Sequence, residues 1–318
     1  MQRKSVSYAK YGYIFSIPFV VSFLIFSLYP IIYTAFIGFT DLKGLNKTDF
    51  KVLADPLQNF KQILDNPSFK ISVSNTFVMW ILNFIPQILL ALLLTVWFTS
   101  HRRRIRGQGA FKVIFYMPNI ITAATVAILF NAMFGYPMGP VNDLFLSLGI
   151  AKEPVYFLIS NWTARSIVSF IQFWQWYGYT MIVLIAGVLG INPELFEAAE
   201  MDGASGTQTF FRVTLPSLRT IMLYMLVTSM IGGLQMFDIP RLFTQGGLGG
   251  PDNSTLSASL FIYIQAFSGT YMYNRAAAAS MIMFIIISGL SAVLFFVMRD
   301  RYAVKLKKAE KAARRAGI

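Results

Sequence analysis

The stretch EAAEMDGASGTQTFFRVTLP, residues 197–216, lies between two long apolar runs and differs from both in its charges and turn-forming residues. Just before it, Asn192 and Pro193 indicate a helix start, because Asn caps a helix and Pro suits its first position. Gly203 then supplies the left-handed turn that ends such a helix. These residues predict a helix that begins near Pro193 and ends one or two residues before Gly203.

A second short helix is predicted after this turn. Ser205 and Gln208 have the S-x-x-Q spacing of a capping box, in which each residue satisfies a backbone N–H of the other. Pro216 lies beyond this helix and is expected to bend or break the chain where it enters the next apolar run. Local chemistry therefore predicts a helix, a sharp turn and a helix within residues 192–219.

Composition indicates a membrane protein. Of 318 residues, 56% are hydrophobic and 13% are charged, whereas soluble domains carry about 25% charged residues. The chain has no cysteine and one histidine, His101, which excludes disulfides, cysteine nucleophiles and metal sites built from thiolates or several histidines. The net charge of +13 would suit nucleic acid, but in a membrane protein basic residues mark the cytoplasmic side, so no nucleic-acid partner is expected.

Six uncharged runs are long enough to cross about 30 Å of hydrocarbon, which takes roughly 20 helical residues. Within lipid, only a helix satisfies its own backbone hydrogen bonds over such a length. The first run is too long for a cleaved signal peptide and is expected to remain as a helix. The sequence predicts an all-α polytopic protein with six spans: Tyr11–Thr40, Ile71–Ser100, Val113–Phe134, Ser166–Gly190, Thr220–Phe237 and Ala276–Met298.

The placement of Lys and Arg predicts the orientation. Basic residues gather before the first span, between the second and third, and after the sixth. With six spans, all three positions fall on one side, the cytoplasm, together with residues 192–219. We therefore expect a multi-pass protein of the cell membrane with both termini cytoplasmic, divided into an N-terminal segment 1–10, a membrane domain 11–300 and a basic tail 301–318.

One further uncharged stretch, residues 253–274, is rich in Ser, Thr, Tyr, Asn and Gln. Counted as a seventh span, it would put the basic tail outside the cell, against the bias of Lys and Arg toward the cytoplasm. We therefore expect it at the outer face, as an amphipathic helix lying along the membrane surface.

The charged stretch resembles the EAA loop of the membrane (permease) subunits of binding-protein-dependent ABC importers. In that family the loop reads roughly E-A-A, three residues, G, and then about nine residues to L-P. The residues that carry this resemblance, and that it implies couple to an ATPase, are Glu197, Ala198, Ala199, Asp202, Gly203, Ala204, Leu215 and Pro216.

The resemblance implies a mechanism and a set of partners. The short helix would dock in a groove of a cytoplasmic ATPase subunit, where Glu197 can pair with a basic residue. Two ATPase copies, a second homologous permease and an extracellular or periplasmic solute-binding protein are expected. The sequence contains no G-x-x-x-x-G-K-[ST] phosphate loop. ATP and Mg²⁺ are therefore expected on the ATPase subunits, and this chain is expected to hold no cofactor or metal and to catalyse no reaction.

A second resemblance points to the carbohydrate-uptake, maltose-type branch of these importers. RLFTQGGLGGPDNSTLSASLFIYIQAF, residues 241–267, is similar to the outer loop of that branch, L-T-x-G-G-P followed by S-T and Y-I-Y-x-x-A-F, although Leu248–Gly250 delay the proline to Pro251. Arg275–Ala278 also resemble the family's entry to the last span. An oligosaccharide or disaccharide is the implied solute, held on the middle and late spans.

The fourth span carries a candidate sugar-binding face. Gln172, Gln175, Trp176 and Tyr179 are spaced i, i+3, i+4 and i+7, so they share one side of a helix. Amides can bond to sugar hydroxyls, and aromatic rings can stack on the CH faces of a sugar. Amides facing lipid are costly, so this side should face a cavity or a neighbouring helix. The alternative is that the glutamines bond to neighbouring helices and the aromatic residues lie near the outer interface.

The fifth and third spans add further candidates. Gly233 and its neighbour Gly232 would allow close approach either of a ligand or of another helix. Asp238 lies three residues before Arg241 and could pair with it or contact a polar solute. The remaining candidate substrate-binding residues are Ser229, Gln235 and, on the third span, Asn119.

An ATPase-independent secondary transporter of a polar solute is the main alternative. Such proteins often contain internal repeats and discontinuous helices near the membrane midplane. No convincing repeat relates the two halves of this sequence, and a secondary transporter would leave the charged stretch at residues 192–219 without a role.

Overall fold

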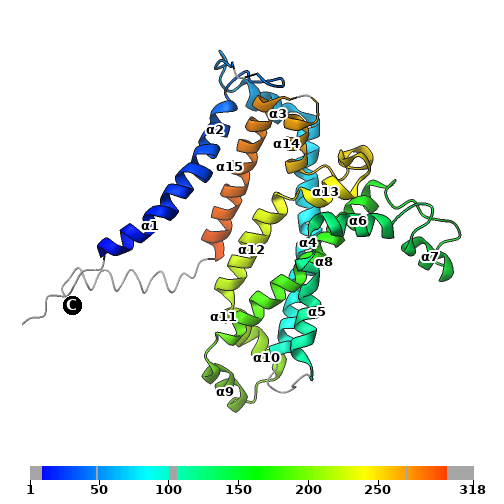
Figure 1. Cartoon of the computed structure of the whole chain (residues 1–318). Helices are drawn as coiled ribbons and strands as arrows, with labels where there is room; N and C mark the ends of the chain where they lie inside the picture. The colour runs from blue at the N-terminus through cyan, green and yellow to red at the C-terminus, as the bar shows by residue number, and fades with distance from the viewer. Residues whose placement is uncertain (1–8, 48, 100–105, 270, 299–318) are drawn as a thin grey trace, which may run out of the picture. The chain divides into compact units, whose positions relative to one another are not determined.

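The computed structural model describes residues 9–47, 49–99, 106–269 and 271–298 (Figure 1). Within these ranges the regular structure is helical, apart from one isolated antiparallel bridge between Thr40 and Val52. The basic tail 301–318, and most of both the N-terminal segment 1–10 and the basic cluster after the second span, lie outside the described residues. The chain forms two compact units, one of residues 1–69 and 262–284 and the other of residues 70–261 and 285–318.

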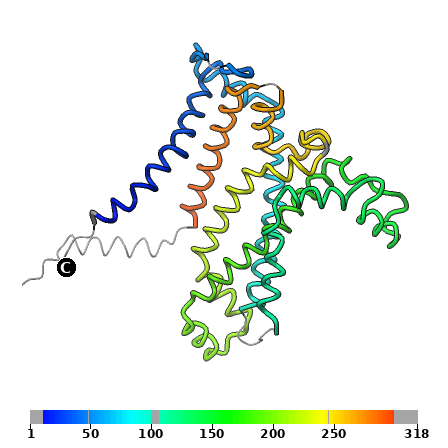
Figure 2. Tube along the Cα trace, in the orientation of Figure 1, coloured from blue at the N-terminus to red at the C-terminus, as the bar shows by residue number. Residues whose placement is uncertain are grey.

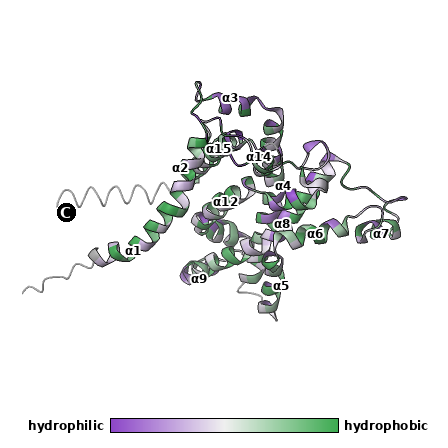
Figure 3. Cartoon of the chain, turned by 45° about the horizontal axis from the view of Figure 1, so that its top comes forward, coloured by the Kyte–Doolittle hydropathy of each residue, from purple (hydrophilic) through white to green (hydrophobic). Residues whose placement is uncertain are grey.

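The first unit holds the long N-terminal helix. α1, a single π-helical turn and α2 follow one another without a break in the helical backbone. Hydrophilic residues of this unit gather on α3 (Figure 3). Asn59 joins the ends of three helices of this unit: its Nδ2 donates to the carbonyls of Gly38 (2.9 Å) and Thr40 (2.8 Å), and its Oδ1 accepts from Asn274 Nδ2 (3.0 Å). The elements are α1 (Ala9–Phe23), the π turn (Leu24–Leu28), α2 (Tyr29–Ile37), α3 (Gln58–Asp65) and the first part of α15 (Tyr273–Met298).

The second unit holds most of the remaining helices, which Figure 2 lets the reader follow along the chain. In it, α9 and α10 lie at the end opposite to α6, α7 and α13 (Figure 1). Its elements are α4 (Pro67–Thr99), α5 (Gln108–Ile120), α6 (Ala123–Met133), α7 (Pro140–Ser147), α8 (Asn161–Leu189), α9 (Pro193–Met201), α10 (Gly206–Thr209), a π turn (Phe210–Thr214), α11 (Leu215–Ser217), α12 (Arg219–Leu234), α13 (Asp238–Phe243), two 3-10 turns (Gln245–Gly247 and Pro251–Asn253) and the first part of α14 (Ala258–Phe267).

Four stretches are single helices long and apolar enough to cross a membrane, and two bent helix pairs raise the number of candidate spans to as many as six. This agrees with an all-helical, multi-pass membrane protein. The single helices are Tyr11–Ile37, Pro67–Thr99, Arg219–Phe243 and Tyr273–Met298, and the bent pairs are Gln108–Ile120 with Ala123–Met133 (92°) and Asn161–Leu189 with Pro193–Met201 (75°).

The expectation of one continuous helix over Val113–Phe134 is wrong. α5 ends at Ile120, and α6 leaves it at an angle of 92°. Between them Ile121 and Thr122 have extended backbone, and the Thr122 side chain caps α6 by accepting from the N–H of Thr125 at 3.3 Å. A Thr placed inside an apolar run thus starts a new helix, because its hydroxyl satisfies an otherwise unbonded N–H.

The expectation of a surface helix over residues 253–274 is wrong in the extent and exposure of the helix, because α14 begins only at Ala258, whereas the position at the outer face stays a prediction. Ser254 through Ala258 are all buried. Asn75 Nδ2 of α4 donates to the carbonyls of Asn253 (2.6 Å) and Leu256 (3.2 Å), and the N–H of Ala258 donates to Thr76 Oγ1 (2.9 Å). Polar side chains of α4 thus fasten the backbone of this segment, because buried backbone polar groups need hydrogen-bond partners.

Two apolar clusters hold the second unit together. One joins α4, α6, α8 and α13 and contains Met79, Phe130, Ile171 and Phe243, all buried. The other joins α4 and α8 to Leu218, just before α12. Each cluster therefore fixes α8 against α4, one toward each end of α8, and between them α8 and α4 can support a cavity.

Candidate functional site

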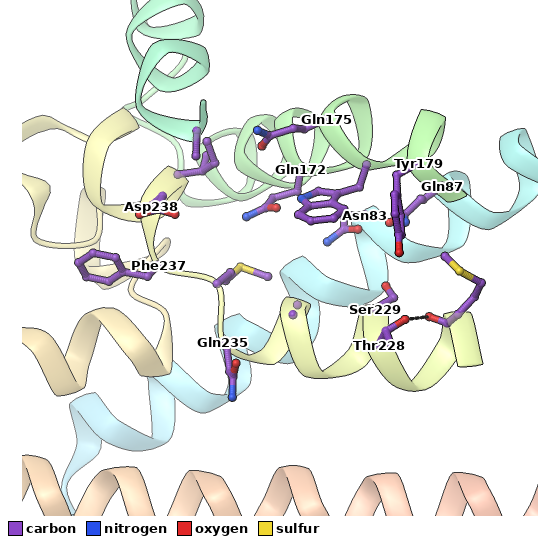
Figure 4. A pocket seen from close by; sticks show the side chains of 17 residues that line it. Asn83, Gln87, Gln172, Gln175, Tyr179, Thr228, Ser229, Gln235, Phe237 and Asp238 are labelled. Atoms are coloured by element: carbon purple, nitrogen blue, oxygen red, sulfur yellow. Dashed lines mark hydrogen bonds between the residues drawn. The ribbon is translucent and has the colours of Figure 1, made fainter. Parts of the chain in front are cut away.

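A cavity of about 410 Å³ lies in the second unit and is lined by residues of α4, α8 and α12, by the first residue of α6, and by the segment that leads from α12 into α13 (Figure 4). Its volume falls in the range of pockets that hold small organic ligands. Most of its polar lining groups are amides and hydroxyls. The lining residues are Asn83, Gln87, Ala123, Gln172, Gln175, Trp176, Tyr179, Met225, Thr228, Ser229, Gly232, Gly233, Gln235, Met236, Phe237, Asp238 and Ile239.

The face of α8 that the sequence singled out lines this cavity with all four of its residues. Gln172 and Tyr179 point into the space that Asn83 and Ser229 enter from other helices (Figure 4). Trp176 keeps 44% of its surface exposed, so its ring is available for contact with a ligand. The shared helical face thus becomes one wall of a cavity.

Gln175 differs from the other residues of this face, because its side-chain amide is hydrogen-bonded within the protein. Only 7% of it is exposed, and its Nε2 donates to the carbonyl of Ile121 at 3.0 Å. This carbonyl lies at the break between α5 and α6, where it has no helical partner. Gln175 therefore supports the alternative that a glutamine here bonds to a neighbouring element, although it also touches the cavity.

Asn119 does not line the cavity. Its Nδ2 points to the backbone carbonyl of Gln175, at 3.4 Å. Its position beside a cavity residue makes it part of the contact between α5 and α8 rather than a direct ligand contact. This contact is close elsewhere too, since a Cβ built on Gly178 would lie 2.0 Å from the carbonyl oxygen of Phe115.

The candidates from the fifth span all line the cavity, namely Ser229, Gly233, Gln235 and Asp238. For Gly232 and Gly233 the sequence left two roles open, close approach of a ligand or close packing of a helix, and the structure gives one role to each glycine. A Cβ on Gly233 would lie 2.1 Å from Cδ1 of Trp80, whereas one on Gly232 would meet nothing within 4 Å. Gly233 therefore permits close packing of α12 against α4, and Gly232 leaves open space in the cavity.

Asn83 and Gln87 are lining residues that the sequence interpretation missed. They lie one helical turn apart on α4 and are only 5% and 4% exposed. Gln87 Nε2 donates to Thr180 Oγ1 of α8 at 2.7 Å. The signal was available: two amides four residues apart, inside an otherwise apolar run, mark one polar face of a membrane helix.

At the other end of α8 lies the segment of residues 192–219, which we call the hairpin. Its first helix, α9, has Asn192 as cap, with Oδ1 accepting from the N–H of Glu194 at 3.1 Å, and ends at Met201. Gly203 follows with φ of +71°. The capping box also forms: Gln208 N–H donates to Ser205 Oγ (3.3 Å), and Ser205 N–H donates to Gln208 Oε1 (2.7 Å). The predicted helix, turn and second helix start are confirmed as local structure.

The second half of the hairpin is less regular than the sequence indicated. After α10, five residues form a π turn before α11 begins at Leu215. Pro216 sits in the first turn of α11, and the break before α12 comes two residues later, at Leu218. Leu218 is 1% exposed and belongs to the apolar cluster with α4 and α8, so packing holds the chain in place at this bend.

The hairpin exposes a mixed surface. Figure 3 shows hydrophilic residues along α9. Glu197, Ala198, Asp202 and Gly203 are exposed, and Met201 keeps 88% of its surface exposed. Ala199 and Ala204 are half-buried. A groove of about 320 Å³ beside the hairpin is lined, among others, by Phe196, Glu197, Glu200, Ala204 and Phe210 of the hairpin and by Thr95, Val96 and Thr99 of α4.

Comparison with known proteins identifies the class. Residues 63–308 match the model of the family of binding-protein-dependent transport system inner membrane components. The chain belongs to this family. It is thus a multi-pass membrane protein, and family membership does not favour a transporter that works alone.

Two relatives and one solved structure illustrate the similarity. The lactose transport system permease protein LacF of Rhizobium radiobacter is 30% identical over 91% of this chain and 94% of its own length. The arabinooligosaccharides transport system permease protein AraP of Bacillus subtilis is 29% identical over 86% of this chain and 84% of its own. A bacterial ABC transporter involved in the import of the acidic polysaccharide alginate shares the fold, with a TM-score of 0.76 and 24% identity over 90% of this chain and 94% of that one.

Proposed function

We propose that this chain is the membrane subunit of an ATP-driven importer of oligosaccharides or disaccharides, and that the solute passes through the cavity between α4, α8 and α12. One observation carries the proposal: in a member of the binding-protein-dependent family, eight candidate sugar-binding residues chosen from the sequence line a single cavity. The names of the relatives that transport lactose and arabinooligosaccharides support a carbohydrate as solute.

The cavity has the chemistry that a sugar needs. Gln172, Ser229 and Thr228 offer donors and acceptors for hydroxyl groups, and Trp176 and Tyr179 offer aromatic faces for the CH groups of a sugar ring. Sugars bind tightly only where their hydroxyls find partners, since an unpaired buried polar group costs about 1–3 kcal/mol. An apolar solute would leave these amides unsatisfied, so the lining selects for a hydroxyl-rich solute.

The hairpin is proposed to couple this cavity to ATP hydrolysis on separate subunits. It follows α8 directly and precedes α12 directly, and these two helices form facing walls of the cavity (Figure 4). A displacement of α9 by a partner therefore acts on both walls at once. The exposed Glu197, Ala198 and Gly203 are the proposed contacts with an ATPase groove. Energetically, a ligand bound at one site shifts a two-state element at another.

The proposed topology has six spans, with the bent α5–α6 pair as the third and α8 as the fourth. Both termini and the hairpin then lie in the cytoplasm, and α7 and α13 lie toward the outer face. The proposed partners are a second homologous permease, two copies of an ATPase that holds ATP and Mg²⁺, and a solute-binding protein, which the family name itself implies.

The solute-binding protein proposed as partner of this chain provides the test. We expect a thermal-shift screen of that protein to find stabilisation by oligosaccharides or disaccharides, and uptake of the same sugar by cells to stop when this chain is removed. Stabilisation by amino acids, peptides or metal ions alone, with no response to any sugar, would contradict the proposed solute class.

A further inference from the structure

The cavity has an uneven charge. Among the described residues that line it, Asp238 is the single acidic residue, and none is Lys, Arg or His. The other polar groups are neutral amides, hydroxyls and one indole. A solute in this space therefore meets a single fixed negative charge.

Asp238 keeps this charge available to the cavity. It begins α13, at the end of the cavity away from Thr228 and Ser229 (Figure 4), and its side chain is exposed. Its carboxylate takes part in no hydrogen bond or ion pair with the residues that the structure describes. The guanidinium of Arg241, three residues on, donates instead to the carbonyl of Gly247 at 2.6 Å.

We infer that the cavity discriminates by charge: it accepts neutral sugars, favours sugars that carry an amine, and excludes sugars that carry a carboxylate. The inference rests on the proposed function, because it assigns the solute of that same cavity. In a site that is partly shielded from water, the energy of two like charges rises as the effective dielectric constant falls. A negative lining also raises the local concentration of cations over anions. Specificity then comes from repelling the wrong solute as well as from bonding the right one.

This sets the chain apart from the alginate importer that shares its fold, whose cargo is an acidic polysaccharide. The same helical scaffold can serve either charge class, because the discriminating group is one residue at the start of a six-residue helix. The position of a carboxylate, rather than the fold, is the proposed determinant.

The negative potential that we infer for the cavity can be tested without knowing which sugar is transported. The chain has no cysteine, so Gly232→Cys places a single thiol in the open space of the cavity. In membranes that contain the assembled transporter, its reaction rate is measured with a methanethiosulfonate reagent bearing a trimethylammonium group and with one bearing a sulfonate. Membranes without the introduced thiol provide the background from partner subunits.

We expect the cationic reagent to react faster, and Asp238→Asn to lower the ratio of cationic to anionic rates by about five- to tenfold. Asp238→Glu, which restores the charge, should keep the ratio. Asp143→Asn removes a carboxylate from α7 that does not line the cavity and should leave it unchanged. A ratio that Asp238→Asn leaves unchanged, or a faster anionic reaction while Asp238 is present, would overturn the inference.

The solute part is tested by protection of the same thiol. Cellobiose, the disaccharide of glucosamine and the disaccharide of glucuronic acid differ mainly in charge. We expect the first two to slow labelling and the third not to, with the difference narrowing in Asp238→Asn. Equal protection by all three would contradict the charge selection. If none protects while the reagent ratio behaves as expected, the sugar solute is wrong and the negative potential still stands, so the two failures are distinguishable.

Discussion

The hairpin and the cavity are built from contacts of very different range. The bonds that cap the hairpin's helices join residues two or three positions apart, such as Asn192 with Glu194 and Ser205 with Gln208. Those around the cavity join residues 93 positions apart, in Gln87 with Thr180, and 54 apart, in Gln175 with Ile121. Because its contacts are local, the hairpin can move as one rigid piece when a partner displaces it. The cavity is built from distant segments, so its shape changes when any of its helices shifts.

We expect the largest effect from a substitution at the contact of α5 with α8, which belongs to the cavity region and not to the hairpin. Gly178→Ala puts a methyl group 2.0 Å from the Phe115 carbonyl oxygen, and forcing the helices apart should cost about 3 kcal/mol and abolish most uptake. Gly232→Ala, which meets no atom within 4 Å, should change stability by less than about 0.5 kcal/mol. Thermal unfolding of the purified transporter measures both, and equal effects of the two substitutions would contradict the tight contact.

Gln175→Leu should weaken the cavity without touching the hairpin. It leaves the Ile121 carbonyl at the α5–α6 break without its partner at 3.0 Å, which costs about 1–3 kcal/mol. Gln235→Leu is the matched control, because the Gln235 amide is exposed and points away from the α8 side chains (Figure 4). We expect a lower unfolding temperature only for Gln175→Leu; a similar decrease for both would show that the bond across the break does not matter.

Gly203→Val should act on the hairpin alone. At φ of +71° a side chain costs about 1–2 kcal/mol, so the turn between α9 and α10 should distort. Co-purification of the ATPase should fall sharply, while the reactivity of a thiol at Gly232→Cys in the cavity should stay the same. Gly206→Ala, at the start of α10 with no atom within 4 Å of the added methyl, serves as control. Undiminished co-purification of the ATPase with Gly203→Val would remove the turn from the coupling mechanism.

Ser205→Ala should have the smallest effect. It removes the side-chain half of the capping box, where Ser205 Oγ accepts from Gln208 N–H at 3.3 Å, and such caps are worth about 1 kcal/mol. Ser217→Ala loses only a bond from its hydroxyl to the Val213 carbonyl and should change little. ATP hydrolysis stimulated by the loaded binding protein should drop a few-fold for the first and stay within error for the second. A larger effect at Ser217 would place the coupling in the second half of the hairpin.

The difference in range also explains what could be predicted from the sequence. The hairpin's first helix, its turn and its capping box follow from Asn192, Gly203 and Ser205, because each signal acts on its immediate neighbours. The face of α8 was likewise visible, since helical spacing places its residues side by side before any packing is known. The exposed surface of the hairpin says nothing by itself about its partner, so the ATPase contact stays a prediction.

What failed depended on tertiary contacts. The break after Ile120 is stabilised by Gln175, 54 residues away from Ile121, and hydropathy does not register such a bond. The polar residues 253–258 appeared suited to water, yet Asn75 and Thr76 of a distant helix bond to their backbone. Asn83 and Gln87 were overlooked because the run around them is otherwise apolar. In each case the clue was one or two polar side chains inside an otherwise apolar helix.

The most direct test of the central claim, that the hairpin drives the cavity with energy supplied by another subunit, is sugar uptake into proteoliposomes. The permease pair is reconstituted with and without the ATPase subunits, with the loaded binding protein outside and ATP inside. We predict uptake only when the ATPase is present, and loss of this uptake in Gly203→Val. Uptake at the same rate by the permease pair alone would contradict it.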